Sequence, residues 1–278
     1  MPELPEVETT RRGLEPHVRG QVITGVTVRH RGLRWPVPRR LAERMIGRRI
    51  ERIERRGKYL LLDCGEGTLI VHLGMSGSLR LARASEPPGP WDHVDVALGD
   101  QVMRLRDPRR FGAVLWHPGD PHSHKLLAGL GVEPLGPAFT PAFLYAASRG
   151  RRVAVKLFLM NAAVVVGVGN IYASESLFRA GLDPRRPAGS LSRAQCAKLA
   201  AAVRETLELA IAAGGSSLRD YVATDGEPGH FQQQYFVYGR GGEPCRQCGT
   251  PVRRIVQGAR STFFCQRCQA RSIGRSAR

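Results

Sequence analysis

Hydrophobic and polar residues alternate through much of the first half of the chain. Val94, Val96 and Leu98 fall on one side of an extended backbone, and Asp95 falls on the other. A period of two residues is typical of half-buried antiparallel strands. The same alternation around Met103 and Leu105, and apolar runs elsewhere, predict further strands near residues 21–30, 49–56, 58–63, 68–73 and 112–116. We therefore predict a β-sandwich in which one face of each sheet meets water.

Helical segments accompany these strands. Residues 3–14 predict an N-terminal helix, and residues 39–46 predict a short helix that interrupts the strands. Glycines at 65 and 67, and the pair Gly99-Asp100, predict tight turns between neighbouring strands. The fold class is therefore α+β.

The pattern becomes helical after a segment rich in glycine and proline at 118–140, which suits a domain boundary. The apolar stretch 153–169 predicts a core helix followed by a turn. Ser192 and Gln195 have the spacing of a capping box, and Gly214-Gly215 can end the helix that follows. Between them lies an apolar stripe that we interpret as core, formed by Leu199, Val203, Leu207 and Ile211.

Length and charge narrow the class of protein. A chain of 278 residues suggests two domains and a small third module. Its 42 basic and 24 acidic residues leave a net charge of +18, which favours a polyanionic partner. The basic residues form many short clusters rather than one amphipathic helix, so nucleic acid is favoured over a membrane surface. The chain shows no signal peptide and no apolar run that could cross a bilayer, which predicts a cytoplasmic protein.

Four cysteines near the C-terminus have the spacing of a metal site. Cys245-x2-Cys248 and Cys265-x2-Cys268 are separated by sixteen residues, which predicts one tetrahedral zinc closing a β-hairpin. The alternative is a redox pair or two unrelated turns. Because sulfur would fill all four positions, the zinc is predicted to be structural. The hairpin also carries arginines, as expected of a nucleic-acid contact: Arg253, Arg254, Arg260 and Arg267.

The opening MPELPEVET places a proline after the initiator methionine, which invites removal of Met1. An α-amino group titrates near pH 8 and a lysine near 10.4, so a freed Pro2 would be the more accessible neutral nucleophile. Attack on a sugar would give an iminium ion, and the neighbouring Glu3 could move the protons. The alternative is that Pro2 simply begins the first helix.

Three further motifs each allow a structural or a functional interpretation. Lys58 is one of only four lysines among the 42 basic residues and interrupts a run of arginines. It is the member of that run that can readily lose its proton, and the alternative is an ordinary surface cation. Gly167–Ala173 places glycines and Asn170 before a helix, where free N–H groups can hold a phosphate, although a tight turn is the commoner use. Residues 107–112 (DPRRFG), and Met75 in Gly74-Met75-Ser76-Gly77, offer side chains that could fill a gap in a base stack, or could serve only packing or a turn.

With these residues assembled, the sequence resembles the bacterial formamidopyrimidine-DNA glycosylases, the Fpg or MutM enzymes of base-excision repair. The resemblance covers essentially the whole chain and is carried by PELPEVET, HLGMSGSLR, DPRRFG, GVGNIYASE and the four-cysteine finger. It implies an N-terminal β-sandwich domain, a domain with a helix-two-turns-helix motif, and a zinc hairpin, with DNA in the cleft between them. The expected boundaries are 1–118 for the catalytic domain, 119–140 for a hinge, 141–235 for the helical domain, 236–270 for the finger and 271–278 for a basic tail.

The resemblance also implies an activity and its residues. It implies excision of 8-oxoguanine and formamidopyrimidines from duplex DNA, followed by β- and δ-elimination through a Schiff base. The implied catalytic residues are Pro2, Glu3, Lys58 and Arg260, and the implied DNA contacts are Met75, Arg109, Phe111, Arg151, Lys156 and Asn170. Met75, Arg109 and Phe111 would replace the extruded base, and residues 216–235 match the loop that covers it. The implied partner is damaged double-stranded DNA, bound by a monomer in the bacterial cytosol or nucleoid, without a nucleotide cofactor.

One departure and two alternatives accompany this resemblance. Relatives often carry His-Asp-His where this chain has Trp91-Asp92-His93, so a DNA contact from the first position is in doubt, and His93 is interpreted as a hydrogen-bonded core histidine. An endonuclease VIII-type enzyme acting on oxidised pyrimidines is the nearest alternative, although Leu4 argues against it. A non-catalytic zinc-finger DNA-binding protein is the other. An unprocessed Met1 would block the nucleophile in either enzyme.

Overall fold

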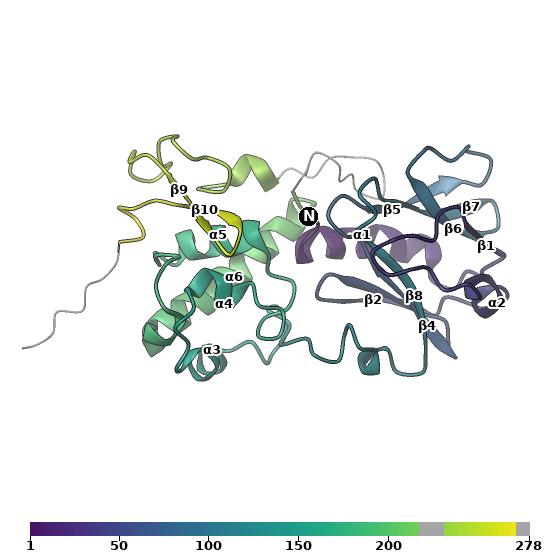
Figure 1. Cartoon of the computed structure of the whole chain (residues 1–278), viewed down its shortest axis with the longest axis horizontal. Coiled ribbons are helices and arrows are strands. Elements are labelled where there is room, and N and C mark those ends of the chain that lie inside the picture. The colour runs from purple at the N-terminus through teal and green to yellow at the C-terminus, as the bar shows by residue number, and fades with distance from the viewer. Residues whose placement is uncertain (217–230, 271–278) are drawn as a thin grey trace, which may run out of the picture. The chain divides into compact units, whose positions relative to one another are not determined.

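A computed structural model describes residues 1–216 and 231–270 (Figure 1). The chain forms two compact units, Met1–Gly129 with Ala210–Gln232, and Leu130–Leu209 with Gln233–Arg278. The domain boundaries expected from the sequence stay a prediction. Among the described residues, none of the helices has the length and apolar character needed to cross a membrane.

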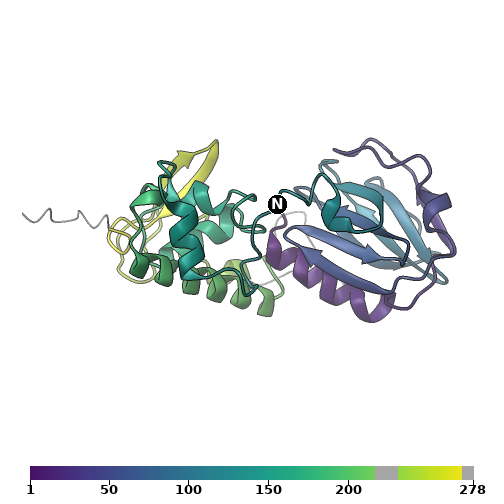
Figure 2. The ribbon, with the colours of Figure 1, turned by 90° about the horizontal axis from the view of Figure 1, so that it is seen from below.

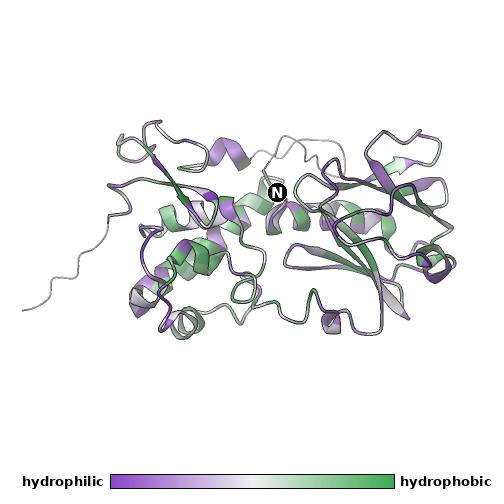
Figure 3. Cartoon of the chain, viewed as in Figure 1, coloured by the Kyte–Doolittle hydropathy of each residue, from purple (hydrophilic) through white to green (hydrophobic). Residues whose placement is uncertain are grey.

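The first unit contains a sandwich of two four-stranded antiparallel sheets, as predicted. One sheet has the order β1-β6-β7-β5, and the other has the order β2-β3-β4-β8. The bounds are β1 Gly25–Val28, β2 Arg52–Arg56, β3 Tyr59–Asp63, β4 Gly67–His72, β5 Ser78–Arg83, β6 Asp92–Leu98, β7 Gln101–Arg106 and β8 Ala113–Pro118. The core between the sheets is apolar and includes Leu60, Leu62 and Val71 from one sheet and Val94, Val96 and Met103 from the other. In Figure 3 the strands of this unit carry both hydrophobic (green) and hydrophilic (purple) segments, as expected when one face of a sheet is buried.

Helix α1 (Leu4–Val18) lies along the side of this sandwich (Figure 2) and contacts the edge strands β2 and β5. It continues one turn beyond the predicted end at residue 14. Pro16 lies inside this helix and removes the hydrogen bond that its backbone N–H would otherwise donate to the Arg12 carbonyl. Leu14 and Val18 are four residues apart and both fully buried, so burial favours the extra turn. Helix α2 (Leu41–Met45) falls within the predicted range, and a 3-10 turn, η1, spans Pro121–Ser123.

Strand β5 was not predicted. It pairs with β7 along its whole length, with Leu79 opposite Leu105 and Leu81 opposite Met103. Leu79 and Leu81 flank Arg80 with a period of two, which is the signal that would have identified the strand.

The prediction that the outer face of β6 and β7 meets water is wrong at its centre. Asp95 is 5% exposed and Arg104 is 1% exposed. The Arg104 guanidinium donates two hydrogen bonds to the Asp95 carboxylate, at 3.0 and 2.9 Å, and a third to the Glu86 carbonyl in the loop between β5 and β6. Arg29 donates to the same carboxylate. Burial alone would raise the pKa of Asp95, but the bonds from the two guanidinium groups outweigh it and lower the pKa.

Replacing Arg104 should therefore destabilise the sandwich strongly. Arg104→Met would leave the buried Asp95 with Arg29 as its remaining guanidinium partner, at an expected cost of about 3 kcal/mol in the free energy of unfolding. Arg106→Met, on the exposed end of the same strand, is the matched control and should change it by less than about 0.5 kcal/mol. Urea unfolding of both variants measures the difference, and equal midpoints would show that the ion pair does not stabilise the fold.

The second unit is helical and ends in a hairpin. Its elements are α3 Pro141–Ser148, α4 Val155–Leu159, α5 Asn170–Arg179, the 3-10 turn η2 Ala188–Ser190, most of α6 Arg193–Ala212, β9 Arg253–Gln257 and β10 Arg260–Phe264. The last three residues of α6 and the first two of a further 3-10 turn, η3 Phe231–Gln234, are assigned to the first unit. The predicted capping box at the start of α6 is confirmed, because Ser192 N–H donates to Gln195 and Gln195 N–H donates to Ser192 Oγ. The predicted stripe is also buried, with Leu199, Val203 and Leu207 fully inaccessible.

Candidate functional site

The start of the chain is held in place by a buried carboxylate. Pro2 is buried, and Glu3, the N-cap of α1, is 2% exposed. The Glu6 side chain accepts the Glu3 backbone N–H at 2.8 Å through one oxygen and the Ser216 backbone N–H at 2.8 Å through the other. Glu6 is itself fully buried. The segment preceding α1 is thus fixed from the first turn of its own helix.

The α-amine of Met1 occupies an environment that favours its neutral form. Burial is the main cause that lowers its pKa from the ordinary value of about 8. The carboxylates of Glu3 and Glu6 act in the opposite direction, and the charges of Lys58 and Arg109 lower the pKa further. A lowered pKa leaves more amine uncharged, and only an uncharged amine is a nucleophile.

Lys58 and the loops at 73–77 and 107–112 gather at one end of the sheet β2-β3-β4-β8. Lys58 stands in the turn before Tyr59, which pairs with His72 on β4. His72 pairs in turn with Ala113, the first residue of β8. One loop leaves β4 directly after His72, and the other enters β8 directly before Ala113. The topology therefore brings together Lys58, Met75, Arg109 and Phe111, which span more than fifty residues of the sequence.

Asp107 joins these two loops. It is fully buried, and its carboxylate accepts the Gly112 N–H at 2.7 Å and the Ser76 hydroxyl at 3.4 Å. The loops approach so closely that a Cβ on Gly74 would lie 2.5 Å from the Gly112 nitrogen, and Gly74 also has a φ of +66°. Glycine is required at this position for both reasons.

The side chains that these loops present are accessible. Phe111 is 41% exposed, and the Arg109 guanidinium lies 5.1 Å from the centre of its ring. Met75 is half-buried. A cation stacked on an exposed ring is a flat, rigid surface of the kind that packs against a base.

His72 completes this end of the sheet. Burial, with the charges of Lys58 and Arg34, lowers the pKa of His72 to about 4, so the ring is neutral at pH 7. Its Nδ1 accepts the Gly74 N–H at 3.0 Å, which places the ring proton on Nε2. His72 was not selected by sequence reasoning.

Stability should fall in acid because of His72. The folded state resists protonation down to about pH 4 and the unfolded chain accepts the proton near 6.5, so the stabilisation is complete above pH 6.5 and is lost as the pH falls through this window. Between pH 7 and pH 5 the wild type should lose roughly 2 kcal/mol more than His72→Gln, whose amide can still accept the Gly74 N–H. Urea unfolding at both pH values measures this, and parallel losses would contradict it.

In the second unit, Lys156 connects α4, α5 and the hairpin. Its ammonium is fully buried and donates to Asn170 Oδ1 at 2.5 Å, Thr262 Oγ1 at 2.7 Å and the Ser261 carbonyl at 3.1 Å. Asn170 also donates to the Ser261 carbonyl. Lys156 therefore positions the start of α5 against β10, and a direct phosphate contact from Lys156 stays a prediction. Arg151 and Arg260 are exposed.

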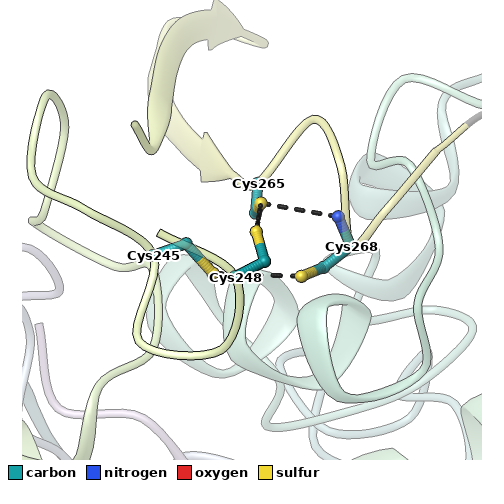
Figure 4. A group of neighbouring side chains, drawn as sticks. All are labelled: Cys245, Cys248, Cys265 and Cys268. Atoms are coloured by element: carbon teal, nitrogen blue, oxygen red, sulfur yellow. Dashed lines mark hydrogen bonds between the residues drawn. The ribbon is translucent and has the colours of Figure 1, made fainter. Parts of the chain in front are cut away.

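The four predicted zinc ligands converge (Figure 4). Cys245 and Cys268 have their sulfur atoms 3.9 Å apart, those of Cys248 and Cys265 are 3.4 Å apart, and all four lie within 4.8 Å of one another. A tetrahedral zinc with bonds of about 2.3 Å requires sulfur atoms about 3.8 Å apart. The residues therefore fit one structural zinc, and the prediction is confirmed.

Sequence reasoning also missed a positioning carboxylate in the second unit. Glu175 on α5 is 1% exposed and accepts the backbone N–H groups of Phe236, Val237 and Tyr238 at 2.8 to 3.0 Å. It fixes the segment that leads into the zinc hairpin. An acidic residue within the buried stretch IYASESLF was the available signal.

Two sequence expectations concern loops near this site. His93 is 5% exposed and bonds to the Asp107 carbonyl at 2.9 Å, which confirms its interpretation as a core histidine. The predicted lesion-covering loop, 216–235, lies mostly outside the described residues.

Known protein families match along the chain. The formamidopyrimidine-DNA glycosylase N-terminal domain matches residues 1–114, the H2TH domain of the same enzymes matches 130–222, and the zinc finger found in FPG and IleRS matches 242–271.

Relatives and solved structures agree. The formamidopyrimidine-DNA glycosylases of Aromatoleum aromaticum and Stutzerimonas stutzeri are each 60% identical to this chain, covering 98% and 97% of it and all of the relative. The MutM (Fpg) protein of Thermus thermophilus is 42% identical, with a TM-score of 0.88 over 96% of this chain and 98% of that one. Lactococcus lactis Fpg in complex with abasic-site DNA is 34% identical, with a TM-score of 0.90 over 96% and 99%. With its sandwich, H2TH domain and zinc finger all matched, the chain belongs to the formamidopyrimidine-DNA glycosylase family.

Proposed function

We propose that this chain excises oxidised purines from duplex DNA, using Pro2 as the nucleophile once Met1 is removed, and then cleaves the strand at the resulting abasic site. Membership of the family supports the reaction class, and a Lactococcus lactis relative was crystallised with DNA containing a formamidopyrimidine lesion. The observation that carries the residue assignment is the burial of Pro2 beside the buried Glu3. In the unprocessed chain, burial and the nearby charges of Lys58 and Arg109 also lower the pKa of the Met1 α-amine at this place. Removing Met1 would place the secondary amine of Pro2 at this end of the chain.

The chemistry assigned to these residues proceeds in order. The Pro2 nitrogen attacks C1′ of the extruded nucleotide and the base leaves, while Glu3 transfers the protons needed to open the sugar ring. The resulting iminium acidifies the C2′ hydrogen, so β-elimination and then δ-elimination remove the sugar. Lys58 assists these eliminations, and Arg260 holds a phosphate for the second. Hydrolysis of the iminium then frees the enzyme.

DNA binding involves both units. Met75, Arg109 and Phe111 fill the gap left by the extruded base, with Arg109 facing the orphaned cytosine. Arg151 and Asn170 hold phosphates, supported by Lys156. Zinc, with four thiolate ligands, takes no part in the chemistry and holds the hairpin in shape. We infer that the enzyme acts as a monomer on the DNA of the bacterial nucleoid.

Borohydride trapping tests this function. Incubating the protein with a duplex that carries 8-oxoguanine opposite cytosine, in the presence of borohydride, should reduce the iminium to a stable protein–DNA adduct. A duplex with thymine glycol opposite adenine should react more slowly. Absence of any adduct would favour a non-catalytic DNA-binding protein, and faster reaction of thymine glycol would favour the pyrimidine-specific alternative.

A further inference from the structure

One exposed aromatic side chain near the DNA-binding loops has no role in the proposed reaction. Trp91 is 44% exposed and Phe111 is 41% exposed, and they are the two aromatic residues among the exposed large hydrophobic side chains of the described chain. Phe111 already has an assigned role. An exposed indole is a large apolar surface, and tryptophan is enriched where such surfaces bind a partner.

The backbone around Trp91 is fixed on both sides. Its carbonyl accepts the Asp107 N–H at 3.0 Å. On the other side, Gly89 N–H donates to the Asp92 carboxylate at 2.8 Å, and Asp92 N–H donates back to the Gly89 carbonyl at 3.2 Å. The turn is therefore closed by its own hydrogen bonds while the indole faces solvent. Because this turn is already ordered, a contact made through Trp91 costs little backbone conformational entropy.

The same turn is joined to the loops that carry the inserted side chains. Asp107 bonds to Trp91 through its backbone N–H, and through its carboxylate it holds the 107–112 loop and the 73–77 loop. Arg109 follows Asp107 by two residues. A partner that meets Arg109 and Phe111 therefore comes within reach of Trp91.

We propose that Trp91 packs its indole against a nucleotide of the strand that carries the orphaned base, next to Arg109. This inference rests on the proposed function, because it takes Arg109 as facing that strand. Stacking on a base or sugar is the contact suited to an uncharged aromatic ring, and it is tolerant of sequence. The contact adds affinity for the distorted duplex without neutralising a phosphate.

Binding as a function of salt distinguishes this contact from an ionic one. The test uses a duplex that carries a tetrahydrofuran abasic analogue opposite cytosine. Trp91→Ala should weaken binding about tenfold at every salt concentration and leave the slope of log affinity against log salt concentration unchanged. Arg151→Ala, which removes a proposed phosphate contact, should instead reduce the magnitude of that slope by about 0.9. Trp91→Phe should recover most of the affinity, and Ile46→Ala, an exposed side chain on another element, should bind as the wild type does. Wild-type affinity of Trp91→Ala, or a reduced slope, would overturn the proposal.

Fluorescence gives a readout that does not depend on activity. The other two tryptophans, Trp35 and Trp116, are partly buried, so the difference between wild type and Trp91→Phe isolates the Trp91 signal. Adding the tetrahydrofuran duplex should lower the accessibility of Trp91 to acrylamide at least about twofold, and an unmodified duplex should do so less. If borohydride traps the wild type but Trp91 stays fully accessible, the Trp91 contact is wrong and the proposed function stands. If no adduct forms, the proposed function itself fails.

Discussion

Blocking the terminal nitrogen should abolish catalysis. A chain that carries a short, uncleaved N-terminal extension before Pro2 has an amide where the proposed nucleophile should be, and an amide nitrogen does not attack a sugar carbon. We expect strand cleavage at 8-oxoguanine to slow by at least about a thousandfold, equivalent to about 4 kcal/mol of transition-state stabilisation, with no borohydride adduct. Single-turnover cleavage of a labelled duplex measures both effects.

Two controls separate a lost nucleophile from lost DNA binding. Affinity for the tetrahydrofuran duplex shows whether the extended chain still binds. Lys58→Arg keeps a positive charge near the terminus but removes the other amine, so it should still form the adduct even if elimination slows. An adduct that disappears in Lys58→Arg and persists in the extended chain would assign the nucleophile to Lys58 instead. Pro2→Gly retains a terminal amine and should be trapped more slowly than the wild type.

The elements that the sequence predicted are those whose signal is local. The alternation along β6 and β7, the capping box of α6 and the paired CxxC turns each depend on residues close together in the chain. Strand β5 has the same kind of signal and could have been identified. Its six residues follow directly on the motif loop 73–77, where the glycines indicated a turn.

The residues that sequence reasoning missed act through partners distant in the chain. Glu6 is tied to Ser216, Asp107 to Ser76 and Trp91, and Glu175 to the segment 236–238. None of these pairings has a periodicity or a spacing that a single sequence reveals. The burial of Arg104 could not be predicted either. The loop that contains Glu86, whose carbonyl accepts a hydrogen bond from Arg104, has no strand or helix pattern in the sequence. Such residues determine where the motif residues point, whereas the motifs themselves indicate only which chemistry is present.

Removing zinc should unfold the C-terminal hairpin. Zinc binding to small finger modules contributes on the order of 10 kcal/mol to their folding, comparable with the whole stability of an ordinary domain. The apolar cluster around the ligands is small and includes Phe178, Val237, Val252 and Phe263, so it should not hold β9 and β10 together without the metal. Cys248→Ser should therefore lose its zinc, and the amides of residues 253–264 should exchange rapidly with deuterium.

The loss should spread to the DNA-binding residues of the second unit. Unfolding of β10 takes away two acceptors of the buried Lys156 ammonium, the Ser261 carbonyl and Thr262 Oγ1, and it displaces Arg260. A buried ammonium that loses its acceptors is strongly destabilising, so Asn170 and the start of α5 should shift as well. We expect the affinity for the lesion duplex to fall at least about a hundredfold.

Cys64→Ser is the matched control, because it replaces a buried thiol of the sandwich, and it should keep one zinc per chain. The opposite outcome would be a Cys248→Ser variant that loses zinc but keeps full protection of the hairpin amides and full DNA affinity. In that case protein contacts, including the hydrogen bonds from Lys156 to β10, would hold the hairpin and position Arg260 without the metal.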